Sequence, residues 1–584
     1  MDNITVTING KEYEVAAGIT VLEAAKAANI NIPTLCYLKD INEIGACRMC
    51  VVEVSEGGRP FRMVTACVYP VSNGMVIKTD TPKITESRKL NLELLLSNHN
   101  QDCLSCIRST TCELQKLCRD YGVSSSRFGG VKTETHTDYS SEAIMRDNSK
   151  CILCRRCVAA CKTMQDIGVI GANNRGFDTE IGCAFEMKLA DTACVNCGQC
   201  IVACPTGALH EKDQTAEVFA ALADPDKKVY ICTAPSVRAT IGECFGYAPG
   251  TDVEGKMVAA IKRLGFDGVF DMNFTADLTI MEEGYELIGR IKENKNLPLI
   301  TSCSPGWIKY CEHYFPEFTD NLSTCKSPQQ MFGAVMKTYF AEKNGLDPKD
   351  IYFVSAIPCT AKKFEVKRDH QSAAGEGIPD VDVAITTREL GRMIEKAGID
   401  FRSLEDEEFD NPFSIGSGAG AIFGATGGVM EAALRTAAEV LTGKELKKVE
   451  FGEVRGNAAI KLATYDLGGL TVKVAVASGT KNAKELLNKI KSGEIEAQFV
   501  EIMCCPGGCV NGGGQPTQPA YVRNNTDLQG LRAAVLYNAD ANKLKYRKSH
   551  ENPQIKQIYA EFFGEPNSHK AHEILHTSYV KRGL

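Results

Sequence analysis

Two short stretches of this chain repeat one cysteine spacing, and that repeat restricts the fold more than any other feature. Residues 151–161 read CILCRRCVAAC and residues 194–204 read CVNCGQCIVAC, both with the spacing C-x2-C-x2-C-x3-C. They belong to a set of 26 cysteines in 584 residues. The N-terminus lacks the basic and apolar regions of a secretory signal, so we expect a cytoplasmic protein, in a compartment where disulfides are rare. Metal binding is therefore the first interpretation to test for these thiols.

The repeated spacing, followed by Pro205 in the second copy, is the signature of bacterial two-cluster ferredoxins. In that arrangement three cysteines of each run bind one iron-sulfur cluster, and the fourth binds the other cluster. The pattern predicts an α+β domain of residues 140–211 that holds two [4Fe-4S] clusters. The predicted ligands are Cys151, Cys154, Cys157 and Cys204 for one cluster, and Cys194, Cys197, Cys200 and Cys161 for the other.

Residues 1–78 carry the alternation of a small β-rich domain. The segment ITVTINGKEYEV predicts a hairpin that turns at Asn9 and Gly10, and VLEAAKAANI after it predicts a helix. One close cysteine pair with two outlying ligands resembles plant-type ferredoxins, although the spacing is longer, and predicts a β-grasp domain with a [2Fe-2S] cluster. A zinc site is the alternative. The four cysteines are Cys36, Cys47, Cys50 and Cys67.

A small helical domain is expected in residues 79–139. Its helical stretch, ITESRKLNLELLLSNHN, ends where a histidine is followed by three cysteines at short intervals. A lone histidine is usually a surface or core residue, but the neighbouring thiols favour a third [4Fe-4S] cluster with one imidazole ligand. The expected ligands are His99, Cys103, Cys106 and Cys112.

The composition changes before residue 212, and residues 212–584 read as one large α/β domain. Four segments each place an apolar strand before a turn rich in Pro, Gly or Cys: KVYICTAPSVRA, LPLITSCSPGW, DIYFVSAIPCTAKK and AQFVEIMCCPGGC. Ligands of α/β sheets bind beyond the carboxyl ends of the strands, so these turns are expected to meet at one site. Three of the turns carry Cys303, Cys359, Cys505 and Cys509, which predicts a buried metal cluster.

Three segments make this part of the chain similar to a known family. TSCSPGW (301–307), PCTAKKFE (358–365) and EIMCCPGGCVNGGGQP (501–516) closely resemble the signature segments of [FeFe]-hydrogenases. The order of the upstream cluster domains resembles large clostridial enzymes and catalytic subunits of NAD(P)-linked multimeric hydrogenases. The resemblance implies reversible reduction of protons to H2 at an H-cluster. That group is a [4Fe-4S] cubane joined by a cysteine sulfur to a di-iron unit with CO, cyanide and a dithiolate amine.

Carried over motif by motif, the resemblance implies roles for single residues. The cubane would be bound by Cys359, Cys505 and Cys509, and Lys362 would donate a hydrogen bond to a cyanide. The proton route would include Glu283, Glu286 and Ser323, although two acids three residues apart are by themselves typical of a solvated helix face. The di-iron pocket would be lined by Pro235, Ser236, Gln329 and Met503.

The chain departs from the family at one position of the first segment. The family commonly has two adjacent cysteines, one a cubane ligand and the other the last proton relay, whereas here Cys303 is followed by Ser304. Gapless register would make Cys303 the relay and would place Ser304 at the ligand position. Iron in such clusters prefers a thiolate to a hydroxyl, which favours Cys303 as the ligand and Ser304 as the relay. We expect the second arrangement.

Charge and hydropathy exclude some partners and leave others. The net charge of -7 gives no case for nucleic acid, and no apolar run is long enough to span a membrane. The resemblance implies ferredoxin or NAD(P)H-oxidising flavoprotein subunits as electron partners, and maturation proteins that supply the di-iron unit.

Two alternative functions stay open at this point. An iron-sulfur electron-transfer subunit of an NADH- or formate-dehydrogenase-like complex would share the first ~210 residues, but it would lack the motif at 501–516. A non-catalytic hydrogenase-like sensor or assembly factor would lack an intact proton route. The presence of Glu283, Glu286 and Ser323 favours the enzyme.

Overall fold

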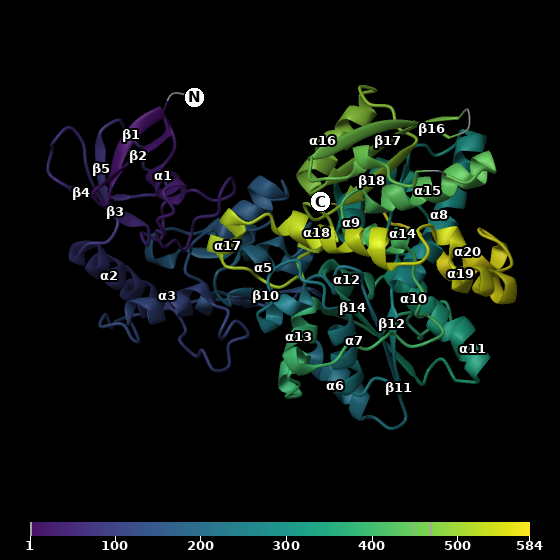
Figure 1. The fold of residues 1–584 in the computed structure, drawn as a ribbon. Coiled ribbons are helices and arrows are strands. Elements are labelled where there is room, and N and C mark those ends of the chain that lie inside the picture. The colour runs from purple at the N-terminus through teal and green to yellow at the C-terminus, as the bar shows by residue number, and fades with distance from the viewer. Residues whose placement is uncertain (1–2, 447, 468–469, 584) are drawn as a thin grey trace.

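The computed structural model describes residues 3–446, 448–467 and 470–583. Figure 1 shows a smaller lobe formed by the purple and blue N-terminal segments, and a larger lobe formed by the teal, green and yellow segments. The elements α5 and β10 lie between the two lobes.

The N-terminal lobe begins with a five-stranded sheet in the order β2-β1-β5-β3-β4. The predicted hairpin is present, because Asn9 and Gly10 adopt the left-handed φ values of 50° and 84° that a tight two-residue turn requires. The helix α1 begins after Thr20, which forms a capping box with Glu23, and it ends three residues earlier than the predicted segment. The bounds are β1 Asn3–Ile8, β2 Lys11–Ala16, α1 Val21–Ala27, β3 Val51–Ser55, β4 Arg62–Thr65 and β5 Met75–Lys78.

Two helices follow this sheet, α2 Pro82–Asn98 and α3 Glu113–Tyr121. Leucines on both helices pack together, and residue 99 lies directly after α2. The predicted helical stretch before the histidine is therefore confirmed. The leucine packing holds the two ends of the His–Cys segment, residues 99–112, in one small core.

The two cysteine runs have the same local fold. Each contains a short helix in its second half, α4 Arg156–Ala159 and α5 Gln199–Ala203. The residues before these helices, Arg155 and Gly198, occupy the same place in the repeat and have left-handed φ values of 60° and 70°. Ile144 and Leu209 of a three-stranded sheet belong to the same core as the runs. The strands are β6 Thr137–Asp138, β7 Ile144–Asp147 and β10 Leu209–Glu211, with a separate pair β8 Gly171–Asn173 and β9 Glu180–Gly182.

The large lobe contains two four-stranded sheets, whereas the sequence indicated only that its strands belong to one α/β domain. The first sheet, β12-β11-β14-β15, is parallel throughout. The second, β13-β18-β17-β16, is parallel except that β16 runs antiparallel to β17. The bounds are β11 Lys228–Thr233, β12 Gly268–Asp271, β13 Leu299–Ile300, β14 Ile351–Ile357, β15 Val383–Thr386, β16 Ile460–Asp466, β17 Thr471–Ser478 and β18 Phe499–Met503.

Helices connect and cover the two sheets. The longest described helix, α8 Asn273–Glu293, contacts α10, α14 and α15, and apolar side chains from its length enter the cores of both sheets. The other helices of this lobe include α9 Pro305–Tyr314, α10 Pro328–Val335, α12 Ala361–Glu365, α14 Gly418–Ala421, α15 Gly428–Thr442, α17 Ala520–Asn525, α18 Leu528–Asn538 and α20 His569–Leu575.

The C-terminal part of the chain returns to the N-terminal lobe, as the yellow α17 beside the blue segments shows (Figure 1). The carbonyl oxygen of Asn524 accepts a hydrogen bond from Lys26 Nζ at 3.0 Å, and its side-chain oxygen accepts from the backbone N–H of Lys39 at 3.1 Å. Within the ranges given above, no helix combines the length and apolar character needed to cross a membrane.

Candidate active site and iron-sulfur sites

One cavity lies where the carboxyl ends of β11, β13, β14 and β18 meet. The four junctions that the sequence places at strand ends therefore converge, even though they belong to two sheets. The cavity wall includes every predicted pocket residue: Pro235, Ser236, Cys303, Ser304, Gln329, Cys359, Lys362, Met503, Cys505 and Cys509. The wall also includes Cys197 from the second cysteine run and Cys504, which the sequence analysis did not place there.

The polar groups of this wall fit an anionic, metal-containing ligand. Lys362 is buried, and its Nζ donates to Ser327 Oγ at 2.6 Å and to Glu365 Oε2 at 2.8 Å. An ammonium has three donors, so one is left for a group in the cavity. Gln329 Nε2 donates to Glu365 Oε2 at 3.1 Å, while its Oε1 is buried without a partner among the described residues. Several thiols and one spare ammonium donor fit an anionic iron-sulfur group.

The three predicted relay residues lie behind this cavity, on α8 and on the loop before α10. Glu283 is buried, and burial raises the pKa of its carboxyl to about 8, so it carries a proton at neutral pH. It interacts with the Ser323 hydroxyl, while its Oε2 has no hydrogen-bond partner in the described ranges. Ser323 Oγ in turn donates to Glu286 Oε2 at 3.2 Å. The structure thus brings Glu283, Ser323 and Glu286 into one chain.

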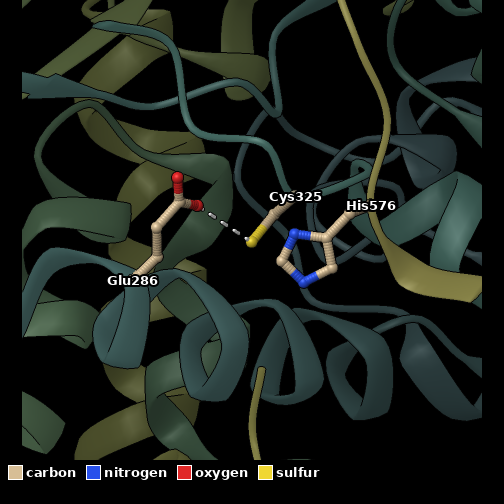
Figure 2. Close-up of side chains that lie close together, drawn as sticks. All are labelled: Glu286, Cys325 and His576. Carbon is tan, nitrogen blue, oxygen red and sulfur yellow. Dashed lines mark hydrogen bonds between the residues drawn. The ribbon is translucent and has the colours of Figure 1, made fainter. Parts of the chain in front are cut away.

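Further residues surround Glu286 that sequence reasoning missed (Figure 2). Arg290 Nη2 donates to Glu286 Oε1 at 2.6 Å, a pair four residues apart on α8 that helix periodicity could have indicated. Cys325 Sγ donates to Glu286 Oε2 at 3.7 Å, and Figure 2 shows His576 beside it. His576 contacts Thr324 Oγ1 through Nδ1 at 2.8 Å, and Thr324 Oγ1 donates to Glu286 Oε2 at 3.2 Å. His576 comes from the residue after α20, which no local pattern connects to α8.

The cysteine runs form two further cavities in the crossed arrangement that the spacing predicts. One cavity is lined by Cys151, Cys154, Cys157 and Cys204, and the other by Cys161, Cys194, Cys197 and Cys200. The fourth cysteine of each run therefore faces the cavity of the other run. Each cavity collects four thiols, which is the ligand set of a [4Fe-4S] cluster.

The structure also gathers the N-terminal cysteines. Hydrogen bonding with Cys47 lowers the pKa of the Cys36 thiol to about 6. Cys50 likewise interacts with Cys67, and that contact lowers the pKa of Cys50. The same two contacts raise the pKa of the Cys47 and Cys67 thiols. The four thiols therefore lie in two close pairs, which suits them to binding a metal cluster.

His99 is buried, and burial lowers the pKa of its imidazole to about 4, so the ring is neutral at pH 7. Its Nδ1 has no hydrogen-bond partner within the described part of the chain. A neutral, unpaired ring nitrogen is the form of histidine that binds a metal. Cys106 and Cys112 influence each other electrostatically, and Cys103 lies three residues before Cys106.

The second cysteine run packs directly against the large cavity. Thr360 Oγ1 donates to the carbonyl oxygen of Asn196 at 2.7 Å. A Cβ added to Gly198 would lie 2.4 Å from Thr360 Oγ1, and one added to Gly513 would lie 2.1 Å from the Cys197 carbonyl oxygen. Cys197 lines both its own cavity and the large one. The two sites therefore share a wall that is one side chain thick.

Comparison with protein families matches the C-terminal half of the chain to hydrogenase families and the N-terminal part to iron-sulfur families. Residues 227–513 match "Iron only hydrogenase large subunit, C-terminal domain", and residues 527–582 match "Iron hydrogenase small subunit". The upstream matches are "2Fe-2S iron-sulfur cluster binding domain" at 1–82, "NADH-ubiquinone oxidoreductase-G iron-sulfur binding region" at 88–127 and "4Fe-4S dicluster domain" at 131–208.

Two curated relatives match over nearly the full length. A protein named NADP-reducing hydrogenase subunit, from Solidesulfovibrio fructosivorans, is 49% identical over 593 residues and covers 100% of both chains. Iron hydrogenase 1 of Clostridium pasteurianum is 44% identical over 579 residues, which is 99% of this chain and 100% of the relative. The chain belongs to the iron-only hydrogenase family.

The solved structure of a variant apo [FeFe]-hydrogenase from Chlamydomonas reinhardtii agrees with this assignment. It matches the hydrogenase described here with a TM-score of 0.57 and 43% sequence identity, over 64% of this chain and 100% of the other. The predicted enzyme class and cofactor types, a [2Fe-2S] cluster, [4Fe-4S] clusters and an H-cluster, are thereby confirmed. The match over 227–513 covers the half that distinguishes an enzyme from an electron-transfer subunit.

Proposed function

We propose that this enzyme reversibly reduces protons to H2 in the large cavity, with electrons relayed through four accessory iron-sulfur clusters. The observation that carries the proposal is the convergence of thiols from three distant strand ends on Lys362 and on a buried carboxylic acid. When bound, the H-cluster supplies the redox-active iron at which protons and electrons combine. The protein supplies its ligands, its hydrogen-bond donors and a route for protons.

The cavity residues have the following proposed roles. Cys359, Cys505 and Cys509 hold the cubane, and Lys362 donates its spare N–H to an anionic ligand of the di-iron unit. Pro235 and Met503 give the di-iron pocket an apolar wall that excludes water. Ser236 and Gln329 provide its polar contacts.

Protons follow a route of buried side chains. Glu283 holds a proton at neutral pH and passes it on, because its pKa of about 8 lies close to the pH of the surroundings. Ser323 both accepts and donates, so it can transfer a proton between Glu283 and Glu286 without ionising. The route reaches the cavity at the wall that Cys303 and Ser304 line.

The upstream domains are proposed to form the electron route. Residues 1–78 make a β-grasp domain with the [2Fe-2S] cluster, and residues 79–139 make a small α domain with the histidine-ligated cluster. Residues 140–211 make the two-cluster α+β domain, and residues 212–584 make the catalytic α/β domain. The wall shared at Cys197 supports transfer from the second [4Fe-4S] cluster to the cubane, since both sites contact that residue.

The proposed partners follow from the same domains. The relative from Solidesulfovibrio fructosivorans is named an NADP-reducing hydrogenase subunit, which supports a multimeric complex for this chain too. We expect ferredoxin or NAD(P)H-oxidising flavoprotein subunits as electron partners, maturation proteins that deliver the di-iron unit, and a cytoplasmic location. Purification from the source cells would show which of these subunits accompany the chain.

The proposed function is tested by an infrared spectrum of the matured protein. Bands from iron-bound CO and cyanide are expected, together with H2 formation from an artificial electron donor. A fully loaded chain should hold about 20 iron atoms, of which ~14 belong to the accessory clusters. A matured sample with only the accessory iron and without these bands would contradict the proposal.

A further inference from the structure

The large cavity holds one thiol more than a cubane needs. Its wall carries five cysteines besides Cys197, which the second accessory cluster uses: Cys303, Cys359, Cys504, Cys505 and Cys509. A [4Fe-4S] cluster takes four thiolates. One of the five is therefore left for another role, and the surroundings of Cys303 and Cys504 show which.

Cys303 lies on the proton side of the cavity. Among charged groups, Glu283 has the largest electrostatic effect on the Cys303 thiol. Cys303 also packs against the core that contains Met503 and Cys509. A thiol beside the buried carboxylic acid is placed to pass protons between that acid and the cavity.

Cys504 lies on the side of the cavity that faces the second cysteine run. Its thiol is buried and interacts with the sulfur atoms of Cys197 and Cys505. Cys505 also influences the thiols of Cys359 and Cys509 electrostatically. Cys505 is thus a neighbour shared by Cys359, Cys504 and Cys509, whereas the leading charged neighbours of Cys303 are Glu283 and Cys509.

Ser304 is already used to position Cys504. The backbone N–H of Cys504 donates to Ser304 Oγ at 3.2 Å, which ties the loop before α9 to the end of β18. A Cβ added to Gly306, two residues after Ser304, would lie 2.7 Å from Cys504 Sγ. The Cys504 sulfur therefore lies against the loop that carries Ser304, the residue at the position of the family's second adjacent cysteine. A serine hydroxyl ionises much less readily than a thiol and is the poorer iron ligand.

We propose that Cys504 supplies the fourth cubane thiolate, with Cys359, Cys505 and Cys509, and that Cys303 is the proton relay. On binding iron the Cys504 thiol releases its proton and forms one Fe–S bond, with no change in oxidation state. Ser304 positions Cys504 and is not a ligand. The inference rests on the proposed function. It keeps the relay role that gapless register gives Cys303, and it assigns the fourth cubane ligand to Cys504 instead of Ser304.

The test uses the full chain reconstituted with iron and sulfide, without the di-iron unit. Cys504→Ala should lose about four iron atoms per chain, and the Mössbauer signal of the cubane should disappear while the accessory signals stay. Cys303→Ala and Ser304→Ala are the matched controls and should keep the full iron content. The double variant S304C/C504A should regain the cubane, because the new thiol lies beside the vacated position.

Three other outcomes would overturn the inference. Loss of the cubane in Cys303→Ala, with Cys504→Ala intact, would make Cys303 the ligand, and loss in Ser304→Ala would make the serine the ligand. Loss of the second accessory signal alone in Cys504→Ala would place Cys504 on that cluster instead. If Cys504→Ala also lost the accessory signals, the double variant would decide, since a ligand role predicts its rescue. The infrared spectrum of the matured wild-type protein tests the proposed function separately.

Discussion

Burial of a single ionisable group supports the proposed proton route. Glu283 lies in the middle of α8, and burial raises the pKa of its carboxyl to about 8. Glu286, three residues later, stays paired with Arg290 at 2.6 Å. One acid of the pair thus holds a proton at neutral pH, and the other accepts hydrogen bonds from Ser323 and Thr324. Of these two acids on one helix face, only Glu286 forms an ion pair within the described part of the chain.

Glu283→Gln should block the proton route without disturbing the cavity, since an amide keeps the shape but cannot take up and release a proton. Turnover with an artificial electron donor should fall by about 100-fold or more, with the CO and cyanide bands retained. In the wild type, the infrared band of a protonated carboxyl should be present below pH about 8 and lost above it. The exposed Glu293 on the same helix is the control, and Glu293→Gln should leave turnover and the carboxyl band unchanged. Near-normal turnover in Glu283→Gln would remove this residue from the route.

His99→Ala should alter one accessory cluster only, because the buried ring is neutral and its Nδ1 lacks a partner among the described residues. One electron paramagnetic resonance signal should shift or vanish, and reduction by an external donor should slow, while H/D exchange at the active site continues. His569→Ala removes an exposed ring, and it should change neither the resonance signal nor the rate of reduction. Equal loss of both activities in His99→Ala would make His99 a structural residue.

At the scale of elements, the contact between the second cysteine run and the loop before α12 sets the distance between the two sites. Gly198 and Arg155 hold the same left-handed position in the repeat, so conformation alone does not require glycine there. Gly198 is required because of its close neighbour Thr360: a Cβ on Gly198 would lie 2.4 Å from Thr360 Oγ1. The glycine therefore allows the two sites to share a wall.

Gly198→Ala should push the cysteine run away from the loop at Thr360. The left-handed backbone costs an alanine roughly 1–2 kcal/mol, and the steric overlap adds to that cost. Reduction of the active site by the accessory clusters should slow, as measured by rapid mixing with a reductant. Gly176→Ala has a similar φ of 63°, and the described residues leave the space around its Cβ open, so it should lower stability only by the backbone cost. The same reduction rate in both variants would disprove the role of the contact.

At the scale of the whole molecule, one buried ion pair joins three distant parts of the chain. Arg156 of the first cysteine run donates to Glu113 of α3 at 2.6 Å and 3.2 Å, and its side chain is only 1% exposed. The backbone N–H of Ala520 donates to the same carboxylate at 3.2 Å. The helix α3, the first cysteine run and the C-terminal part are thereby fixed relative to one another.

Glu113→Ala should leave Arg156 buried without a partner and lower the free energy of unfolding by about 3–5 kcal/mol. Thermal unfolding and loss of accessory-cluster absorbance should both shift to lower temperature. Lys116→Ala breaks the exposed pair Lys116–Asp120 on the same helix and should cost less than about 1 kcal/mol. A similar shift in both variants would show that the pair contributes little to holding the parts together.

Local sequence patterns were sufficient to predict those features that depend on the spacing of residues along the chain. The crossed cysteine sets, the hairpin at Asn9–Gly10 and the helix before His99 follow from a few neighbouring residues, and the structure has all three. The strand-end turns also met at one cavity, because chain direction in a parallel sheet brings the carboxyl ends of strands to one edge. Motif resemblance then indicated the family, which the comparisons confirm.

Only the tertiary structure decided which side of the cavity each thiol occupies. The two sheets place Cys303 toward Glu283, and Cys504 toward Cys197 and Cys505, although both cysteines are adjacent to motif residues in the sequence. His576 and Thr324 reach Glu286 from segments 290 and 38 residues away in sequence, so no periodicity could indicate them. Spacing determines which residues can share a turn or a helix face. The packing of distant elements determines which of those residues share a cavity, because side-chain contacts depend on distance in space.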